Sequence, residues 1–327
     1  MASEWISYSE LERLGPEVLR ARISESPQQA ARWVRAAALN GLVSAQLAWG
    51  QMLIDGVGVA RDPDAALRWF EVAARSGNAD GINMLGRCHE LGWGLPADPA
   101  TAILFYRQAA EKGHAWAQFN LASLLVAGNG APQDRTQALE WFVRSARRGN
   151  TKAMTMIGRY LEHGWDRPSR PRAALFWYER AARGDEYRAQ FDFARLLLEM
   201  TDRLDLALPW FSRAVESGFP AFCRDVGEGL RHSTSPALQS IARRALERAC
   251  ETGSAEDLRR YASALAQGLG GPCDPEGART AFAHARELDD RAELATAADK
   301  ERPSGTHRPA HWKKQIKNFV ALFKNSK

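Results

Sequence analysis

Very few side chains in this sequence stand where a reaction or a bound metal would need them. His307 and His311 are four residues apart and could hold one metal ion from a single helical turn. Pro309 lies between them and opposes a helix there, and no third ligand is visible, so we interpret the spacing as chance. The sequence has no Ser-x-x-Lys motif and no evident grouping of a nucleophile with a base. It therefore predicts no catalytic residue, no metal and no cofactor.

Pairs of glycines that flank a single residue recur along the chain. The pairs are Gly56/Gly58, Gly92/Gly94, Gly128/Gly130 and Gly268/Gly270. A phosphate-binding loop follows a strand and leads into Gly-Lys-Ser/Thr, whereas these pairs lie between two helical patterns and no such sequence follows them. We therefore predict that the pairs are turns between helices.

An aromatic residue that recurs every 36 residues or so indicates a tandem repeat. The positions are Trp33, Trp69, Phe105, Trp141 and Trp177, continued at similar steps by Trp210, Ala245 and Ala281. A unit of this length cannot bury its apolar face alone, so neighbouring units must stack into a solenoid. The units after Gly218 lose this aromatic anchor. Stacked repeats make long surfaces, which disfavours a closed catalytic pocket.

Each anchor is flanked by residues that define a helix and its ends. For Trp69, the small residues Ala66 and Ala73 lie on the same helical face, and Gly77 follows. Small residues let helices approach closely, and a glycine in the left-handed conformation ends a helix. Asp62 followed by proline is typical of a helix start. Each unit is thus a helix, a glycine-rich loop, a capped helix and a glycine stop, which predicts an all-α chain with strands essentially absent.

The segment from Ala45 to Gly77, AQLAWGQMLIDGVGVARDPDAALRWFEVAARSG, resembles the Sel1-like repeat, a relative of the tetratricopeptide repeat. The resemblance covers residues 27–290. It implies a right-handed α/α superhelical solenoid of about seven helix-turn-helix repeats plus terminal helices, working as an adaptor in protein complexes. We expect an N-terminal helical cap over 1–26, a helix end and polar linker over 291–310, and a basic amphipathic helix over 311–327.

The resemblance also implies a concave groove lined by the first helix of each repeat. Polar side chains beside aromatic ones suit an extended peptide, whose backbone needs hydrogen-bond partners. The candidate groove residues are Gln46, Trp49, Asn83, Arg87, Gln118, Asn120, Met154, Arg159, Gln190 and Arg195.

Two tryptophans occupy the loop position between the helices of their repeats. Trp93 and Trp165 are 72 residues apart, or two repeats. A tryptophan exposed at a loop tip can mark a binding edge. The alternative is that each ring packs over the adjacent helix end, and the sequence leaves both interpretations open.

The net charge of +5 is concentrated in the C-terminal tail. Residues 300–327 carry eight lysines and arginines against Glu301 alone, so the rest of the chain is slightly acidic. A nucleic-acid-binding solenoid would spread basic residues over its surface, so we expect no nucleic-acid partner. The tail has an apolar helical face made of Trp312, Ile316, Phe319 and Phe323. Such a helix could cap the solenoid or dock on it, bind a partner's groove, or make weak contact with an anionic membrane.

The four cysteines show neither C-x-x-C spacing nor one pair per repeat. Together with an N-terminus that has no apolar run, this predicts reduced thiols, no secretory signal and a cytoplasmic protein. Abundant alanine and arginine with few lysines before position 300 favour a bacterial source. No apolar stretch is long enough to predict a membrane span. The sequence thus favours a non-enzymatic adaptor that binds a peptide or protein partner. The alternatives are a membrane-associated scaffold and, less favoured, a hydrolase related to secreted cysteine-rich members of the family.

Overall fold

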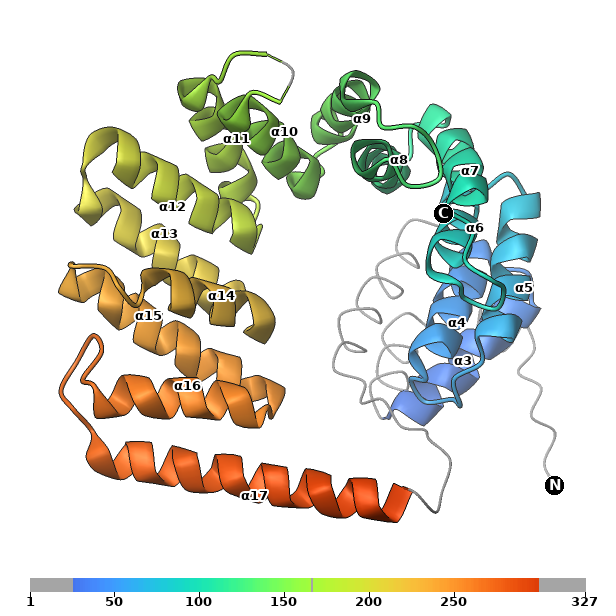
Figure 1. Ribbon diagram of the computed structural model, residues 1–327. Coiled ribbons are helices and arrows are strands. Elements are labelled where there is room, and N and C mark those ends of the chain that lie inside the picture. Colours follow the sequence, from blue (N-terminus) through green and yellow to red (C-terminus); the bar gives the residue numbers. More distant parts are fainter. Residues whose placement is uncertain (1–25, 166, 300–327) are drawn as a thin grey trace, which may run out of the picture. The chain divides into compact units, whose positions relative to one another are not determined.

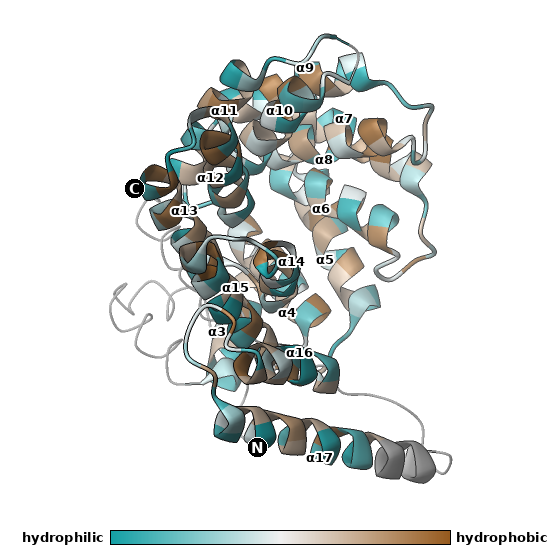
Figure 2. Ribbon diagram, turned by 60° about the vertical axis from the view of Figure 1, so that its left-hand side comes forward, coloured by the Kyte–Doolittle hydropathy of each residue, from teal (hydrophilic) through white to brown (hydrophobic). Residues whose placement is uncertain are grey.

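The computed structural model describes residues 26–165 and 167–299, and within them the chain forms helices and turns but no strand (Figure 1). Every helix carries both polar and apolar residues, as Figure 2 shows by colour. Across these residues the all-α prediction is confirmed. None of the described helices is both long and apolar enough to span a membrane.

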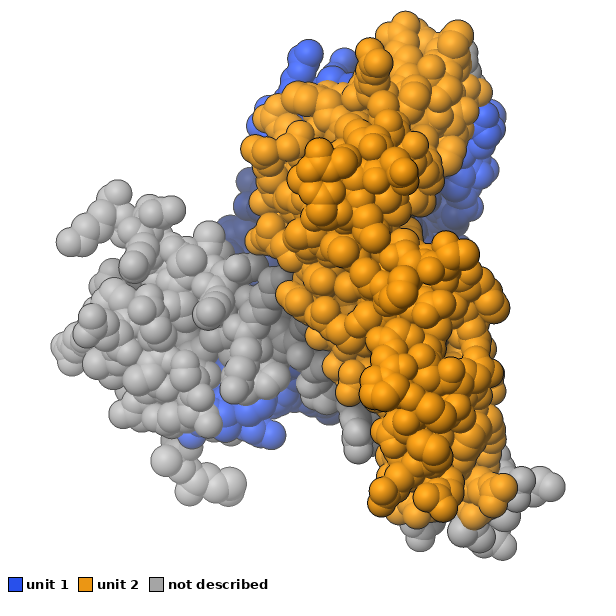
Figure 3. Space-filling model, turned by 90° about the vertical axis from the view of Figure 1, so that its left-hand side faces the viewer, with its two compact units in different colours: residues 1–150, 307–327 blue, residues 151–306 orange. Residues whose placement is uncertain are grey.

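The chain divides into two compact units at Asn150, shown in different colours in Figure 3. The helices of unit 1 are α3 (Pro27–Leu39), α4 (Val43–Asp55), α5 (Pro63–Arg75), α6 (Ala79–Leu91), α7 (Pro99–Glu111), α8 (Ala115–Ala127) and α9 (Arg135–Arg147). Those of unit 2 are α10 (Thr151–His163), α11 (Pro171–Arg183), α12 (Tyr187–Thr201), α13 (Leu204–Ser217), α14 (Pro220–Leu230), α15 (Pro236–Ala249), the 3-10 turn η1 (Cys250–Thr252), α16 (Ala255–Ala266) and α17 (Pro275–Asp299).

Within each unit, consecutive helices pack as hairpins. The pairs are α4 with α5, α6 with α7 and α8 with α9 in unit 1, and α10 with α11, α12 with α13, α14 with α15 and α16 with α17 in unit 2. We call the earlier member of each pair the first helix and the later member the second helix. Within the described residues this arrangement confirms a solenoid of about seven helical hairpins, each of which buries its apolar face against its neighbours.

Five Ser-Pro or Asp-Pro pairs of the kind predicted at Asp62 all begin helices, and four of them carry the expected side-chain cap. The carboxylates of Asp62, Asp98 and Asp274 each accept a hydrogen bond from a backbone N–H of the first turn that follows. The hydroxyl of Ser26 accepts one in the same way. Ser235 also precedes a proline, but its side chain makes no such bond.

The glycine pairs are confirmed as turns. Gly56 ends α4 in the left-handed conformation, with φ of +67°, and Gly58 follows with φ of +69°. A Cβ on Gly58 would overlap the carbonyl of Pro27, at the start of α3. The pair therefore both reverses the chain and lets the loop lie against that helix.

Two of the predicted glycine stops differ from the others. Gly218 follows α13 in an extended conformation, with φ of −71°, so the prediction of a left-handed residue there is wrong. In the preceding repeat Asp185 takes the left-handed conformation, with φ of +59°, next to Gly184. Aspartate tolerates this region better than most residues, so the turn is kept without glycine at that position.

In the second helices from α5 to α13, the most deeply buried ring is the residue after the predicted anchor. Phe70, Tyr106 and Tyr178 are fully buried, whereas Trp69, Phe105 and Trp177 are partly exposed. The neighbouring small residues, such as Ala66 and Ala73, are buried as predicted. On first helices, glycine makes room for the buried ring: a Cβ on Gly86 would lie 2.6 Å from the Tyr106 ring.

Several sequence predictions fall outside the described residues. These are the cap over 1–26 except for Ser26, the residues from 300 onward with His307 and His311, and the tail face of Trp312, Ile316, Phe319 and Phe323. The last described helix, α17, continues past residue 290 as far as Asp299.

Candidate partner-binding surfaces

Three of the predicted groove residues are buried structural amides. Gln46, Gln118 and Gln190 occupy one repeat position on first helices, and each donates a side-chain hydrogen bond to the carbonyl eight residues earlier, in the last turn of the preceding second helix. The acceptors are Ala38, Ala110 and Ala182, at 3.5, 3.0 and 3.3 Å. Each of these carbonyls also accepts a backbone N–H from the turn that follows, so the amide adds a second hydrogen bond that ties the first helix to the end of the preceding helix. These amides are therefore not available to a ligand, and the predicted binding role does not fit them.

Met154 and Trp49 are also in the interior. Met154 occupies the repeat position of the three glutamines and is buried, and Trp49 belongs to the apolar core of unit 1. Both were predicted to face a ligand. Their burial makes them packing residues, because a buried ring or thioether offers no surface to a partner.

The other predicted residues of unit 1 come together on its first helices. Asn120 on α8 donates a hydrogen bond of 3.1 Å to the Asn83 side-chain oxygen on α6, which joins the two repeats. One turn further along α6, the guanidinium of Arg87 lies 4.7 Å from the centre of the Trp93 ring. This distance is typical of a cation–π contact. Asn83, Asn120, Arg87 and Trp93 thus form one continuous polar and aromatic stretch.

Large apolar side chains extend this stretch on both helices. Leu91 on α6 and Trp116 on α8 are 50% and 49% exposed. The Trp116 ring makes an edge contact with Phe119, and Phe119 in turn packs on Phe142. We define the unit 1 face as Arg87, Leu91, Trp93, Trp116 and Asn120. Asn83 is itself buried and supports the face by accepting the hydrogen bond from Asn120. Amide groups beside exposed apolar side chains can bind both the backbone and the side chains of a peptide.

The first helices of unit 2 are different, because their charges are paired with each other. Arg159 on α10 binds Asp192 on α12 at 3.1 Å, and Arg195 on α12 binds Glu162 on α10 at 2.6 Å. Burial raises the pKa of Asp192, which the charge of Arg159 partly offsets. Both predicted groove arginines of unit 2 are therefore engaged within the fold.

The same pattern continues on the next first helices. Arg224 on α14 reaches the fully buried carboxylate of Asp257 on α16 with two short hydrogen bonds. The Thr252 hydroxyl donates a third bond to this carboxylate, and Arg260 donates a fourth. The hydrogen bonds from Arg224 lower the pKa of Asp257 below its ordinary value, against the effect of burial.

Both loop tryptophans are half-buried. Trp93 packs against the core of unit 1 and below Arg87. Trp165 packs edge-on against Tyr160, one turn earlier at the end of α10, with ring centres 5.6 Å apart. Each ring covers the end of a helix, and Trp93 is part of the unit 1 face.

Three of the four cysteines have thiols that burial makes less acidic than usual. Burial raises the pKa of the Cys88 thiol to about 12 and that of Cys250 to about 11, and it raises the pKa of Cys223 as well. All four cysteines of the chain are free. No group of three or more histidine, cysteine, aspartate or glutamate side chains that could hold a metal occurs among the described residues.

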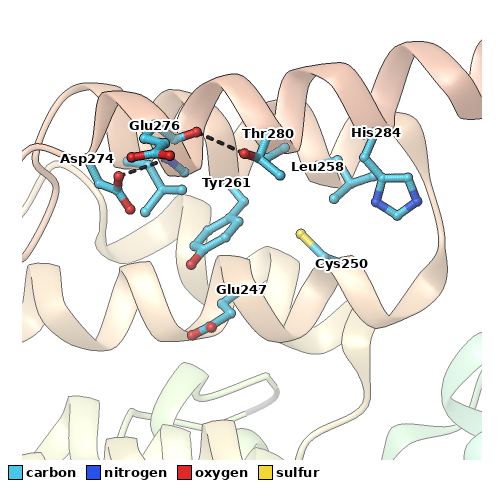
Figure 4. Close-up of a pocket in the computed structure, with 11 residues that line it drawn as sticks. Glu247, Cys250, Leu258, Tyr261, Asp274, Glu276, Thr280 and His284 are labelled. Atoms are coloured by element: carbon cyan, nitrogen blue, oxygen red, sulfur yellow. Dashed lines mark hydrogen bonds between the residues drawn. The ribbon is translucent and has the colours of Figure 1, made fainter.

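An open groove of about 560 Å³ lies between α15, α16 and α17, and the sequence prediction missed it (Figure 4). Its walls include Glu247 and Cys250 from α15, Tyr261 and Leu265 from α16, and Glu276 and His284 from α17. A signal for it was present in the sequence, namely the loss of the aromatic anchor at Ala245 and Ala281.

Five segments of the chain match the Sel1 repeat: residues 17–42, 43–78, 79–114, 117–150 and 151–186. Together they make up more than half of the chain. The protein belongs to the Sel1 repeat family. Members of this family are in general non-enzymatic scaffolds for interactions between proteins. The resemblance drawn from the repeat sequence is thereby confirmed.

Two solved structures illustrate the fold of this Sel1 repeat protein. A protective antigen of uropathogenic Escherichia coli with an SLR fold is 26% identical, with a TM-score of 0.55 over 85% of this chain. The match covers 62% of the antigen, so the chain spans less than two thirds of that relative. A Sel1 repeat protein from Oxalobacter formigenes is 22% identical, with a TM-score of 0.62 over 73% of this chain and 100% of the other. No curated protein matches the sequence.

Proposed function

We propose that this Sel1 repeat protein is a non-enzymatic adaptor that binds an extended segment of a protein partner across the unit 1 face. The observation that carries the proposal is the contrast between the two sets of first helices. Those of unit 2 carry arginines and carboxylates that neutralise each other, as in the Arg159–Asp192 and Arg195–Glu162 pairs. On the unit 1 face, by contrast, Leu91 and Trp116 are about half exposed beside polar groups.

The composition of the unit 1 face indicates the kind of partner. Trp116 and Leu91 offer apolar area to side chains of a peptide, and hot spots of protein interfaces are enriched in tryptophan and arginine. Asn120 uses one amide N–H to hold Asn83, and its carbonyl oxygen is an acceptor for a peptide N–H. Arg87 adds a positive charge at the edge of the face. A segment with apolar side chains and an acidic residue fits these groups.

The same observations support a scaffold acting in a reducing compartment, and we propose the cytoplasm. The cysteines carry no cross-link, and burial raises the thiol pKa of Cys88, Cys223 and Cys250, so those thiols stay protonated at neutral pH. An adaptor needs no reacting group, since its contribution is to hold partners together.

The proposal is tested by comparing variants of the two surfaces of unit 1. Tagged full-length protein captures partners from lysate, and each partner is then purified and its affinity measured. We expect Trp116→Ala and Asn120→Ala each to weaken binding about tenfold, the effect of losing roughly 1.4 kcal/mol at an interface. Leu104→Ser is the matched control, because Leu104 is the most exposed large apolar residue on the second helices of unit 1.

The outcome against the proposal is equally specific. A partner that binds Trp116→Ala and Asn120→Ala as tightly as the parent protein does not use this face. Loss of binding with Leu104→Ser alone would move the interface to the second helices.

A further inference from the structure

The open groove of unit 2 lies between α15, α16 and α17, at the place that an aromatic anchor fills in other hairpins. In the α12–α13 hairpin, the Trp210 ring packs edge-on against Phe193, with centres 5.3 Å apart. In the α6–α7 hairpin, the Phe105 ring stacks on His89 at 5.2 Å. The anchor ring of a second helix thus rests on two positions of its first helix, which lie one turn apart.

In the α16–α17 hairpin the same two positions are present but the ring is not. Counted along the repeat, Tyr261 corresponds to Phe193 and Leu265 corresponds to His89. The anchor position itself is Ala281. All three residues line the groove (Figure 4). The groove therefore has room for a ring that the last hairpin does not supply, with Tyr261 and Leu265 as its floor.

A cationic side chain is missing at the same place. On α15, Arg244 directly precedes the anchor position and reaches across to α13, where it donates to the Ser212 hydroxyl at 3.4 Å and to the Glu216 carboxylate at 3.1 Å. On α17 the residue before the anchor position is Thr280. Its hydroxyl donates to the carbonyl of Glu276 in its own helix, as Figure 4 shows. Thr280 therefore does not make the bridge to α15 that Arg244 makes to α13.

A carboxylate that could receive such a cation is present on α15. Glu247 lines the groove and stands two residues after the anchor position, as Ser212 does on α13. Burial and the charge of Glu247 raise the pKa of Tyr261, and Arg243 offsets part of this effect. Arg243 itself donates to the carbonyl of Pro272, and within residues 26–165 and 167–299 no ion pair involves Glu247. The groove thus combines an apolar floor with a carboxylate that lacks a counter-charge.

We propose that this groove binds a segment of a second protein partner in which an arginine stands next to an aromatic residue. The ring fills the vacant anchor position on Tyr261 and Leu265. The guanidinium takes the place that Arg244 holds in the preceding hairpin and binds Glu247. Arginine suits this role better than lysine, because its planar fork can make two hydrogen bonds to one carboxylate.

The rest of the rim favours the same sign of charge. Asp274 and Glu276 line the groove at the start of α17, and of the other described lining residues only His284 can carry a positive charge. Such a rim attracts a basic segment and repels an acidic one. The unit 1 face, with Arg87, instead fits a segment with an acidic residue. The two surfaces therefore select different sequences, and the groove lies outside the adaptor proposal made for unit 1.

The probe for the test is a fluorescein-labelled synthetic peptide, Gly-Ser-Arg-Trp-Ser-Gly, titrated with the full-length protein. We expect saturable binding, measured as fluorescence anisotropy. Exchange of the peptide's tryptophan for alanine, or of its arginine for glutamate, should each lower the affinity about tenfold. A peptide with neither arginine nor tryptophan measures the background.

Changes in the groove give the reciprocal test. Ala281→Trp supplies the missing ring and should lower the affinity for the probe about tenfold. Ala283→Trp is the matched control, because it adds the same ring at an exposed position of α17 outside the groove and should leave the affinity unchanged.

Glu247→Gln tests the charge and keeps the proposal testable if Ala281→Trp does not fold, as judged by circular dichroism. Glu247 is exposed, so its exchange should not disturb the fold. We expect an affinity loss of about tenfold for the arginine peptide and none for the same peptide with alanine in place of arginine. Glu287→Gln, an exposed change on α17 outside the groove, should bind both peptides as the parent protein does.

The proposal is contradicted if the probe does not bind saturably, or if neither Ala281→Trp nor Glu247→Gln weakens its binding. N-acetyltryptophanamide that binds as tightly as the probe would assign the groove to a small molecule. A dimer of the free protein that Ala281→Trp breaks would assign it to a second copy of the chain. Trp116→Ala should leave the affinity for the probe unchanged, so failure here is distinguishable from failure of the adaptor proposal.

Discussion

The phenol of Tyr178 donates a hydrogen bond of 2.8 Å to the carboxylate of Glu162, sixteen residues earlier in the chain. Tyr106 and Glu90 make the same contact in another hairpin, again sixteen residues apart. At Phe70 and Phe142, where the buried ring is phenylalanine, the residue sixteen positions earlier is aliphatic, namely Ile54 and Val126. The buried hydroxyl and its acceptor therefore occur together or not at all, which is expected because a buried polar group needs a partner.

This pairing predicts that exchanging the buried ring in either direction destabilises the protein. Tyr178→Phe should lower the free energy of unfolding by about 1–2 kcal/mol, since Glu162 loses a donor but keeps Arg195. Phe142→Tyr should also destabilise, by about 1–3 kcal/mol, because its hydroxyl has no acceptor beside Val126. Urea unfolding measures both.

Adding Val126→Glu to Phe142→Tyr supplies the acceptor and should recover part of the loss. Additive effects of these two substitutions would show that the pair does not interact.

The repeat spacing was enough to predict the helices, their order and most of their ends. It could not decide which of two adjacent aromatic residues is buried, because Trp69 and Phe70 recur with the same period. That choice depends on a rotation of about 100° around the helix, which only the packing of the neighbouring helix determines. The fully buried residue is Phe70, as the small residues Ala66 and Ala73 on either side of it along the same face would have indicated.

Only part of the candidate site could be predicted from the sequence, because the rest of it also depends on how neighbouring helices pack. Gln46, Gln118 and Gln190 stand at one repeat position, and a polar residue fixed at one position of a repeat is typical of a structural role. Asn83 and Asn120 occupy different repeat positions, so their contact follows from how α6 and α8 pack and could not be derived from the period. The groove beside Ala281 is open because a small side chain stands where other hairpins carry an aromatic ring. The sequence signals this only as the loss of an aromatic residue.

The glycines of the first helices give a prediction about packing. A Cβ on Gly86 would lie 2.6 Å from the Tyr106 ring, so Gly86→Ala should destabilise the protein by about 1–3 kcal/mol. Gly229→Ala is the control, because no atom lies within 4 Å of its Cβ position in α14. There, alanine should stabilise by about 0.4–1 kcal/mol through its better helix propensity. Equal effects in thermal unfolding would contradict this account of the buried ring.

The buried glutamines give a prediction that separates stability from binding. Gln118→Met should cost about 1 kcal/mol, since the hydrogen bond to the Ala110 carbonyl is lost while the volume is kept. Methionine is accommodated at this position in the next repeat, at Met154. Partner affinity should stay within about twofold of the parent protein at a temperature where both are folded. A large loss of affinity would restore Gln118 to the binding surface.

The Arg224–Asp257 pair predicts how stability depends on pH. The pKa of Asp257 is lowered in the folded protein by the hydrogen bonds from Arg224, from an ordinary value of 3.8. A carboxyl with a lowered pKa contributes its stabilisation above the ordinary value and loses it as the pH falls further. Asp257→Asn should therefore lower stability at pH 7 and flatten the decline below about pH 4, measured by urea unfolding at each pH. Asp205→Asn is the control, since Asp205 also binds an arginine, Arg203, but in full contact with water, where screening makes such a pair weak. If Asp257→Asn leaves the acid decline as steep as Asp205→Asn does, the buried carboxylate is not the group whose protonation unfolds this part of unit 2.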